Sequence, residues 1–292
     1  MISAIGYYVF YGFAQFISIL PFSCIYLFAD LLYILLRITG YRSKIILNNL
    51  RNSFPEKSEK EIQKIRKEYL HFMADYILES IKGITISKEE ISNRVRVSNI
   101  EILYHYKNIN QSIIATAGHY GNWEMCGLGA SLVIPQPLIG VYKPLTNVRF
   151  EKLMGKVRQK WGLELVPMWE VADSFEKSHN KRTTIHIMVG DQSPSDPNKA
   201  YWTRFLNQDT AYHYGIEKYA RRYNYPVVFC KVNCIKRGHY HIEIIDLIPS
   251  PNEHNPNEIT EICKNYLEQI IKDNPVPWLW SHNRWKHKKP TT

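Results

Sequence analysis

The segment TAGHYGNWEM, residues 116–125, holds a histidine and a glutamate five positions apart. An imidazole can take a proton from a hydroxyl or amine while that group attacks an acyl carbonyl, and a neighbouring carboxylate fixes the imidazole tautomer and stabilises the imidazolium. Helical neighbours are three and four residues apart. His119 and Glu124 can therefore meet only if His119 precedes a helix and Gly121 lets the loop fold back. The alternative is a structural histidine beside an ordinary helix start.

The flanking residues predict a strand, a tight loop and a helix. The segment SIIATAG, residues 112–118, is rich in β-branched residues and predicts a strand that ends at Gly118. Asn122 is suited to cap a helix over 122–131 and to shape the loop. Glu124 then lies in the first helical turn, where the helix dipole favours an ionised carboxylate.

Asp191 is a second candidate to orient the imidazole of His119. It ends the predicted strand TTIHIMVGD, residues 183–191. Strand ends converge at one edge of a sheet, so Asp191 could share or take over the role of Glu124. It could equally cap the turn in GDQSPSDP.

Strand and helix patterns alternate along the chain. Further strands are expected at 138–143, 225–233 and 239–246, and helices at 55–83, 146–160, 170–180, 210–223 and 255–273. This alternation predicts an α/β fold with a central mixed β-sheet flanked by helices. The last two strands, joined by CIKRG, read as an antiparallel hairpin.

Two helix starts carry specific capping signals. Ser58 and Glu61 form a capping box at the start of the helix over 55–83, and Gly83 closes that helix. In the last helix, Asn255 is expected as the cap and Pro256 as the first helical residue.

The N-terminal residues 1–37 predict a hydrophobic helical membrane anchor, and residues 38–292 a single domain. No charged side chain occurs before Asp30, and Pro21 interrupts the apolar run. We expect either a single tilted span or two shorter helices lying partly in the interface, with core helices of a soluble protein as the alternative. Basic residues that follow the run place the rest of the chain on the cytoplasmic face of the membrane.

The composition narrows the kinds of partner that this protein can bind. The formal net charge is +10 over 292 residues, which favours an anionic partner: nucleic acid, a membrane leaflet, or a phosphorylated or acidic substrate. The basic residues form no nucleic-acid recognition pattern, so we expect no nucleic acid partner. The five scattered cysteines indicate reduced thiols. We expect no metal site, no bound cofactor and a monomer.

Six blocks in order resemble the bacterial lipid A biosynthesis acyltransferases, within the wider H-x4-D/E acyltransferases. They are the N-terminal run with YRSKIILNNLRNSFPE, then GHYGNWEM, VYKPL, GDQSP, WTRFLNQDTAYHYG and PVPWLWSHNRWKHKKP. The resemblance covers nearly the whole chain and implies that residues 38–292 are an acyltransferase domain at the inner membrane. It implies transfer of a fatty acyl chain from acyl carrier protein, or from a CoA thioester, to a hydroxyl of a phosphorylated, membrane-embedded glycolipid.

The resemblance also implies roles for individual residues. His119 is the general base, Glu124 its partner, and Asp191 a further catalytic candidate. Tyr142, Lys143 and Arg284 are candidates to bind acceptor phosphates or the donor's phosphopantetheine, with surface or packing roles as the alternative. The full set of expected substrate-binding residues is Tyr120, Gly121, Asn122, Trp123, Tyr142, Lys143, Pro144, Gln192 and Arg284.

Two departures from the family pattern concern the acceptor. Lys143 replaces an arginine and loses its bidentate geometry, and Asn207 stands where the family has a glycine. A second hypothesis therefore keeps the chemistry but changes the acceptor to a hydroxyl or amino group of another envelope lipid or a polyene. A third, of a different class, is a non-catalytic lipid-binding protein of the membrane surface.

Overall fold

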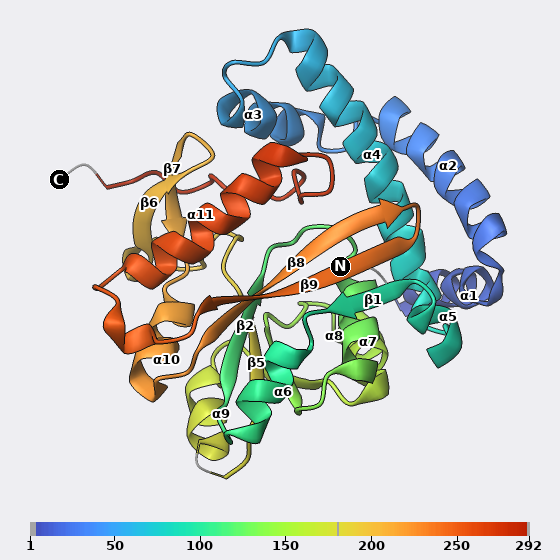
Figure 1. The fold of residues 1–292 in the computed structure, drawn as a ribbon. Coiled ribbons are helices and arrows are strands. Elements are labelled where there is room, and N and C mark those ends of the chain that lie inside the picture. The colour runs from blue at the N-terminus through green and yellow to red at the C-terminus, as the bar shows by residue number, and fades with distance from the viewer. Residues whose placement is uncertain (1–3, 180, 291–292) are drawn as a thin grey trace.

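The computed structural model describes residues 4–179 and 181–290, and its central feature is a mixed seven-stranded sheet (Figure 1). The strand order is β1-β9-β8-β2-β5-β3-β4. Its strands are β1 Val95–Ser98, β2 Ile113–Ala117, β3 Leu138–Tyr142, β4 Glu164–Pro167, β5 Ile185–Val189, β8 Val227–Lys236 and β9 His239–Ile248. The predicted α/β class with a central mixed sheet is confirmed.

Helices cover both faces of the sheet (Figure 1). They are α1 Ala4–Ile19, α2 Phe22–Ile38, α3 Ser43–Ser53, α4 Glu59–Lys82, α5 Lys88–Ser92, α6 Glu101–Asn108, α7 Trp123–Val133, α8 Val148–Arg158, α9 Val171–Ser178, α10 Gly215–Tyr223 and α11 Glu258–Asp273. Successive residues of the central strand β2 point to opposite faces. Ile113 and Ala115 join the core with α4 and α7, whereas Ile114 packs with α9 and α10.

Within the seven-stranded sheet, all described strand pairs are parallel except the β8–β9 hairpin. That antiparallel hairpin was predicted, but Cys234 to Lys236 extend β8 rather than form the turn. The hairpin tip, with Gly238 at φ +70°, reaches α4 (Figure 1). The long strands thus carry their turn to the N-terminal helices.

The hairpin β6 Tyr201–Phe205 and β7 Gln208–Tyr212 was missed, as were the short strands β1 and β4. The predicted helix over 210–223 was wrong at its start, because residues 210–212 lie in β7. Leu206 and Asn207 both have positive φ, 48° and 62°, as the tight turn of a two-residue hairpin requires. Asparagine tolerates this conformation, which explains how it replaces glycine at 207.

The helix caps were predicted with mixed success. The capping box of Ser58 and Glu61 is present, and α4 ends before Gly83 as predicted. The cap of the last helix was wrong: α11 begins at Glu258 with Asn257 as its N-cap residue. The buried carboxylate of Glu217 in α10 accepts hydrogen bonds from the backbone N–H groups of Asn257 and Thr260. It thus does what the side chain of an N-cap residue would do at the start of α11.

The N-terminal apolar run forms two helices, α1 and α2, which break at Pro21. Residues 1–3 of the predicted anchor lie outside the described residues. The inner face of α2, including Ile25 and Ala29, is fully buried and belongs to the same core as α4. Helix α2 therefore packs in one core with residues on the other side of the predicted domain boundary at residue 37.

The outer faces of α1 and α2 are apolar and exposed. Among the most exposed apolar side chains are those of Ile5, Val9, Leu27 and Ile38, whose exposed fractions are 77 %, 68 %, 63 % and 80 %. Within residues 4–179 and 181–290, no single helix has the length and apolar character needed to cross a bilayer. Helices α2 and α3 meet that test only as a pair, bent by 86°.

Candidate active site

His119 and Asp191 meet at one edge of the sheet. Strands β2 and β5 are parallel neighbours with Ala117 opposite Val189, so the residues two positions beyond each strand end come together. His119 Nδ1 lies 2.6 Å from Asp191 Oδ1, and the backbone N–H of His119 donates to Asp191 Oδ2 at 2.8 Å. The carboxylate therefore holds both the ring and the backbone of the histidine.

The surroundings of Asp191 keep its carboxyl group ionised. Burial on its own raises the pKa of Asp191, but the charge and hydrogen bonds of His119, with the indole N–H of Trp278 at 2.8 Å, outweigh burial and lower it to about 2. An ionised carboxylate only accepts hydrogen bonds. His119 Nδ1 must then carry the proton, and the Nε2 lone pair is left without a hydrogen-bond partner among the described residues.

Glu124 faces a different partner from the one expected. Arg158, the last residue of α8, donates to both of its oxygens, from Nε at 2.9 Å and from Nη2 at 2.5 Å. Both side chains are largely shielded, with 7 % of Glu124 and 26 % of Arg158 exposed. The planar fork of a guanidinium matches a carboxylate, which explains why Glu124 turns to α8. The hydrogen bond expected from Glu124 to the imidazole is made by Asp191.

The pairing of Glu124 predicts a stability effect. Arg158→Met is expected to destabilise the fold by about 3–5 kcal/mol, because it leaves a buried carboxylate without a partner. The matched control is Arg182→Met, which breaks a bidentate pair with Glu164 whose side chains are 45 % and 47 % exposed; we expect about 1 kcal/mol or less there. Urea denaturation of both variants measures the difference, and equal losses would contradict a buried structural pair.

The loop between β2 and α7 depends on glycine geometry. Gly121 has φ +66°, and a Cβ there would lie 2.7 Å from Val232 Cγ1. Its predicted role in folding the loop back therefore has a backbone cause. Tyr120 is buried, and its hydroxyl donates to the carbonyl of Asn274 at 2.8 Å. Trp123 packs edge-to-face on His119, with ring centroids 5.1 Å apart.

Asn122 connects this loop to α4. Its side-chain oxygen accepts from the backbone N–H of Met125 at 3.1 Å, so it caps α7 as expected. Its amide donates to Glu79 Oε2 at 2.8 Å. Glu79 is fully buried and also accepts from the hydroxyls of Tyr240 and Tyr26, at 2.6 and 3.0 Å. Three donors thus satisfy a buried carboxyl group that positions the loop.

The remaining predicted binding residues lie in different surroundings. The Tyr142 hydroxyl donates to Glu151 Oε1 at 2.6 Å, and exposed Lys143 donates to Ser195 Oγ at 3.2 Å. Pro144 is half-buried beside Lys143, and Gln192 is half-buried beside Asp191. Of these four residues, Tyr142 alone is among the described residues that line the cavity at His119.

Arg284 is buried, with 2 % exposed, and lies over the ring of Tyr212 at 5.5 Å. Its Nε and Nη2 have no hydrogen-bond partner in the described structure. Burial lowers the pKa of Arg284 to about 10, against the opposing charges of Tyr212 and Asp191. Its position is therefore beneath the site rather than at an open surface.

An apolar cavity of about 240 Å³ opens beside His119. Thr116, His119, Glu124, Tyr142 and Arg158 are polar residues of its wall. Most of the other lining residues are apolar, and they come mainly from α7 and from strands of both halves of the sheet. Such a wall suits a hydrocarbon chain. His119 thus lines a cavity whose wall is suited to a hydrocarbon chain.

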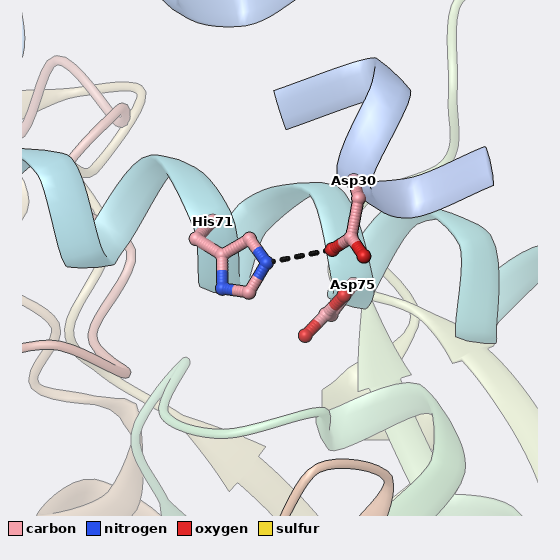
Figure 2. A group of neighbouring side chains, drawn as sticks. All are labelled: Asp30, His71 and Asp75. Atoms are coloured by element: carbon pink, nitrogen blue, oxygen red, sulfur yellow. Dashed lines mark hydrogen bonds and ion pairs between the residues drawn. The ribbon is translucent and has the colours of Figure 1, made fainter. Parts of the chain in front are cut away.

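A second cluster of acidic and histidine side chains lies away from this cavity. Figure 2 shows Asp30 of α2 beside His71 and Asp75 of α4, a grouping that could hold a metal ion. However, the Arg237 guanidinium donates to Asp30 at 2.6 Å and to Asp75 at 2.8 and 2.5 Å. His71 Nε2 lies 2.8 Å from Asp30. The oxygens a cation would need are already bound, so the cluster is an ion-pair network joining α2, α4 and the hairpin tip.

Three residues near the site had no local signal in the sequence. Trp278 donates to Asp191, Arg158 binds Glu124 and Glu79 binds Asn122. Each contact joins residues between 34 and 87 positions apart. The tryptophan-rich C-terminal block was recognised, but its contact with Asp191 was not.

Comparison with known proteins gives a family match over nearly the whole chain. The model of one family, described as bacterial lipid A biosynthesis acyltransferase, matches residues 1–287. No curated protein matches the chain. The match includes the histidine, its carboxylate partner and the residues around the cavity.

Proposed function

Because the chain belongs to the bacterial lipid A biosynthesis acyltransferases, we propose that it transfers a fatty acyl chain from a thioester to a hydroxyl of a lipid A precursor. One observation carries the proposal at the level of the site. The imidazole of His119 is bound at Nδ1 by Asp191 and lines an apolar cavity, and its Nε2 has no hydrogen-bond partner among the described residues. A base beside a hydrocarbon site is the arrangement that acyl transfer to a hydroxyl needs.

In the proposed reaction, the donor's acyl chain occupies the cavity and its thioester carbon lies at His119. Nε2 takes the proton of the acceptor hydroxyl while the oxygen attacks the thioester carbon. Asp191 holds the imidazolium that results. When the tetrahedral intermediate collapses, the carbon–sulfur bond breaks and the leaving thiolate takes the proton from the imidazolium. The products are the ester and the free carrier thiol.

Arg158 supplies positive charge at the wall of the same cavity. Two of its nitrogens bind Glu124, which leaves Nη1 without a hydrogen bond among the described residues. We assign Arg158 to stabilise the developing oxyanion, and Glu124 to hold the guanidinium in place. This role replaces the expected contact of Glu124 with the imidazole.

The charge and the surface of the protein support the proposed donor and location. Acyl carrier protein, an acidic partner, suits a chain with a formal net charge of +10. The exposed apolar faces of α1 and α2 hold the enzyme at the cytoplasmic face of the inner membrane. The reaction as written uses no metal or bound cofactor.

The test is acyl transfer by the purified protein in detergent. Labelled acyl carrier protein and CoA thioesters are each offered with lipid A precursors and with other envelope lipids, and the products are identified by mass spectrometry. An acylated lipid A precursor supports the proposal. Transfer to another lipid alone supports the second acceptor hypothesis, and lipid binding without any transfer supports a non-catalytic protein.

The cavity also predicts chain-length control. Gly127 of α7 lines the cavity, and nothing lies within 4 Å of a Cβ added there. Gly127→Leu should fill part of the cavity and shift the preference between donors that differ by one methylene pair towards the shorter by about tenfold or more. Competition between two labelled donors measures the shift.

The matched control is Gly12→Leu, which makes the same change in α1, where an added Cβ also meets nothing within 4 Å. Replacement of a helical glycine does not weaken helix propensity. An unchanged donor preference in Gly127→Leu would show that the chain lies elsewhere.

A further inference from the structure

A second pocket lies between α1 and α8, outside the cavity at His119. Its volume is about 690 Å³. Tyr7, Tyr8 and Tyr11 of α1 form one wall, and α8 forms the opposite wall. The rings of Tyr7 and Phe10 pack on Phe150, with centroids 5.3 and 5.0 Å apart, so α1 is held against α8.

The α8 wall is positively charged. Arg149, Lys152 and Lys156 line the pocket and follow at spacings of three and four, which places them on one face of the helix. Within the described part of the chain, none of the three lies within 4.0 Å of a carboxylate oxygen. Arg149 lies 6.0 Å over the ring of Tyr7. These cations are free to bind an anion.

One carboxylate, Glu151, also lines the pocket, and its oxygens are already bound. Oε1 accepts from the Tyr142 hydroxyl at 2.6 Å, and Oε2 accepts from the backbone N–H of Leu145 at 2.8 Å. Three cations against one carboxylate leave a local charge of +2. Glu151 therefore lowers the positive charge of the pocket without cancelling it.

The pocket adjoins the catalytic cavity. Tyr142 and Leu165 belong to the walls of both. Among the described residues, only these shared side chains are common to the two walls, so a lipid bound between α1 and α8 would have to pass Tyr142 to reach His119. The pocket at Arg237 has no such connection, because its walls share no described residue with the cavity.

The rim of the pocket is suited to a lipid rather than to a soluble anion. Tyr8 and Val148 are 64 % and 65 % exposed, and Val9 and Phe13 on α1 are 68 % and 50 % exposed. Tyrosines prefer the headgroup level of a membrane, and basic side chains there attract anionic lipid groups. Exposed basic side chains that line a pocket beside an exposed apolar helix face match a phosphate that is attached to a lipid.

We propose that this pocket binds a phosphate group of the lipid acceptor and sets the enzyme's preference for phosphorylated glycolipids. The proposal rests on the proposed acyl transfer and names the residues that select its acceptor: Arg149, Lys152 and Lys156. It differs from the sequence-based expectation, which gave this role to Tyr142, Lys143 and Arg284.

The test compares a triple variant, Arg149→Gln with Lys152→Gln and Lys156→Gln, with wild type. KM is measured for one glycolipid acceptor in its phosphorylated and enzymatically dephosphorylated forms. The variant should raise KM for the phosphorylated acceptor by about tenfold or more and bring the two forms close to equality. Equal losses for both forms would overturn the proposal.

The control variant, Lys107→Gln with Lys177→Gln and Lys218→Gln, removes the same charge from α6, α9 and α10. It should keep the wild-type preference for the phosphorylated acceptor. If the control loses that preference too, the preference depends on the net charge of the protein and not on the pocket. If neither wild type nor control transfers acyl groups, the proposed function fails, and binding of the phosphorylated glycolipid in phosphatidylcholine vesicles still tests the pocket.

Two further experiments identify which phosphate the pocket binds: that of the acceptor, of the membrane lipids or of the donor. Phosphatidylcholine vesicles with and without phosphatidylglycerol show whether the variant loses affinity for anionic membranes in general, and such a loss would overturn acceptor recognition. Replacing acyl carrier protein by acyl-CoA shows whether the KM change follows the donor instead, which would also overturn it. A loss confined to the phosphorylated acceptor, with either donor, supports it.

Discussion

Replacement of His119 by alanine is expected to lower kcat for acyl transfer by about 10²–10⁴-fold, which is the contribution of a positioned general base. The reason is geometric: Asp191 binds Nδ1, Nε2 has no hydrogen-bond partner among the described residues, and His119 lines the apolar cavity. KM for donor and acceptor should change little, because the imidazole acts on the reacting oxygen and not on the chain or headgroup. Single-turnover assays with a labelled thioester measure the chemical step directly.

The control is His105→Ala, which removes an exposed imidazole from α6. It should keep the wild-type rate, and thermal unfolding of both variants should show intact folds. Turnover at the wild-type rate in His119→Ala would exclude His119 as the base. In that case the cavity would still be a lipid site, but the proposed chemistry would fail.

Asp191→Asn should lower kcat about as far as loss of the base itself, whereas Glu124→Gln should have the smaller effect. The amide introduced at position 191 could donate as well as accept, so His119 Nδ1 would no longer be held in the protonated tautomer and the imidazolium would lose its counter-charge. Glu124 binds Arg158 and acts on the reaction only through that guanidinium. Rates of both variants, at matched donor concentrations, decide which carboxylate serves His119.

A double-mutant cycle tests directly which carboxylate acts through His119. If Asp191 works through His119, adding Asp191→Asn to His119→Ala should cost little further activity, since residues that act as a unit are not additive. Adding Glu124→Gln to Arg158→Gln should likewise cost little, because Glu124 acts on the reaction through that guanidinium. A severe loss in Glu124→Gln combined with a mild one in Asp191→Asn would restore the pairing that the spacing of the motif alone suggested.

The alternating strand and helix patterns predicted the class of fold, and the convergence of parallel strand ends brought Asp191 towards His119 as a candidate. Both inferences depend on local periodicity and on a general property of parallel sheets. Strands β1 and β4 were missed because they have only four residues each, and β6 and β7 were missed because they meet in a turn without glycine.

The orientation of Glu124 could not be predicted from the motif. Its place in the first turn of α7 was predicted and is observed. The direction of its side chain depends on Arg158, which follows 34 residues later at the end of another helix. In the same way Glu79 lies 43 residues before the Asn122 that it binds.

By itself, the sequence determined the elements that carry the site: a strand that ends before His119, a glycine loop, a helix capped by Asn122 and a broken apolar segment at the N-terminus. These follow from propensities and capping, which act over a few residues. Only the tertiary structure decided that Asp191 serves the imidazole and Arg158 serves Glu124. The packing of helices and strands brings distant charges together, and a buried carboxylate binds the best-placed donor, whatever its distance along the chain.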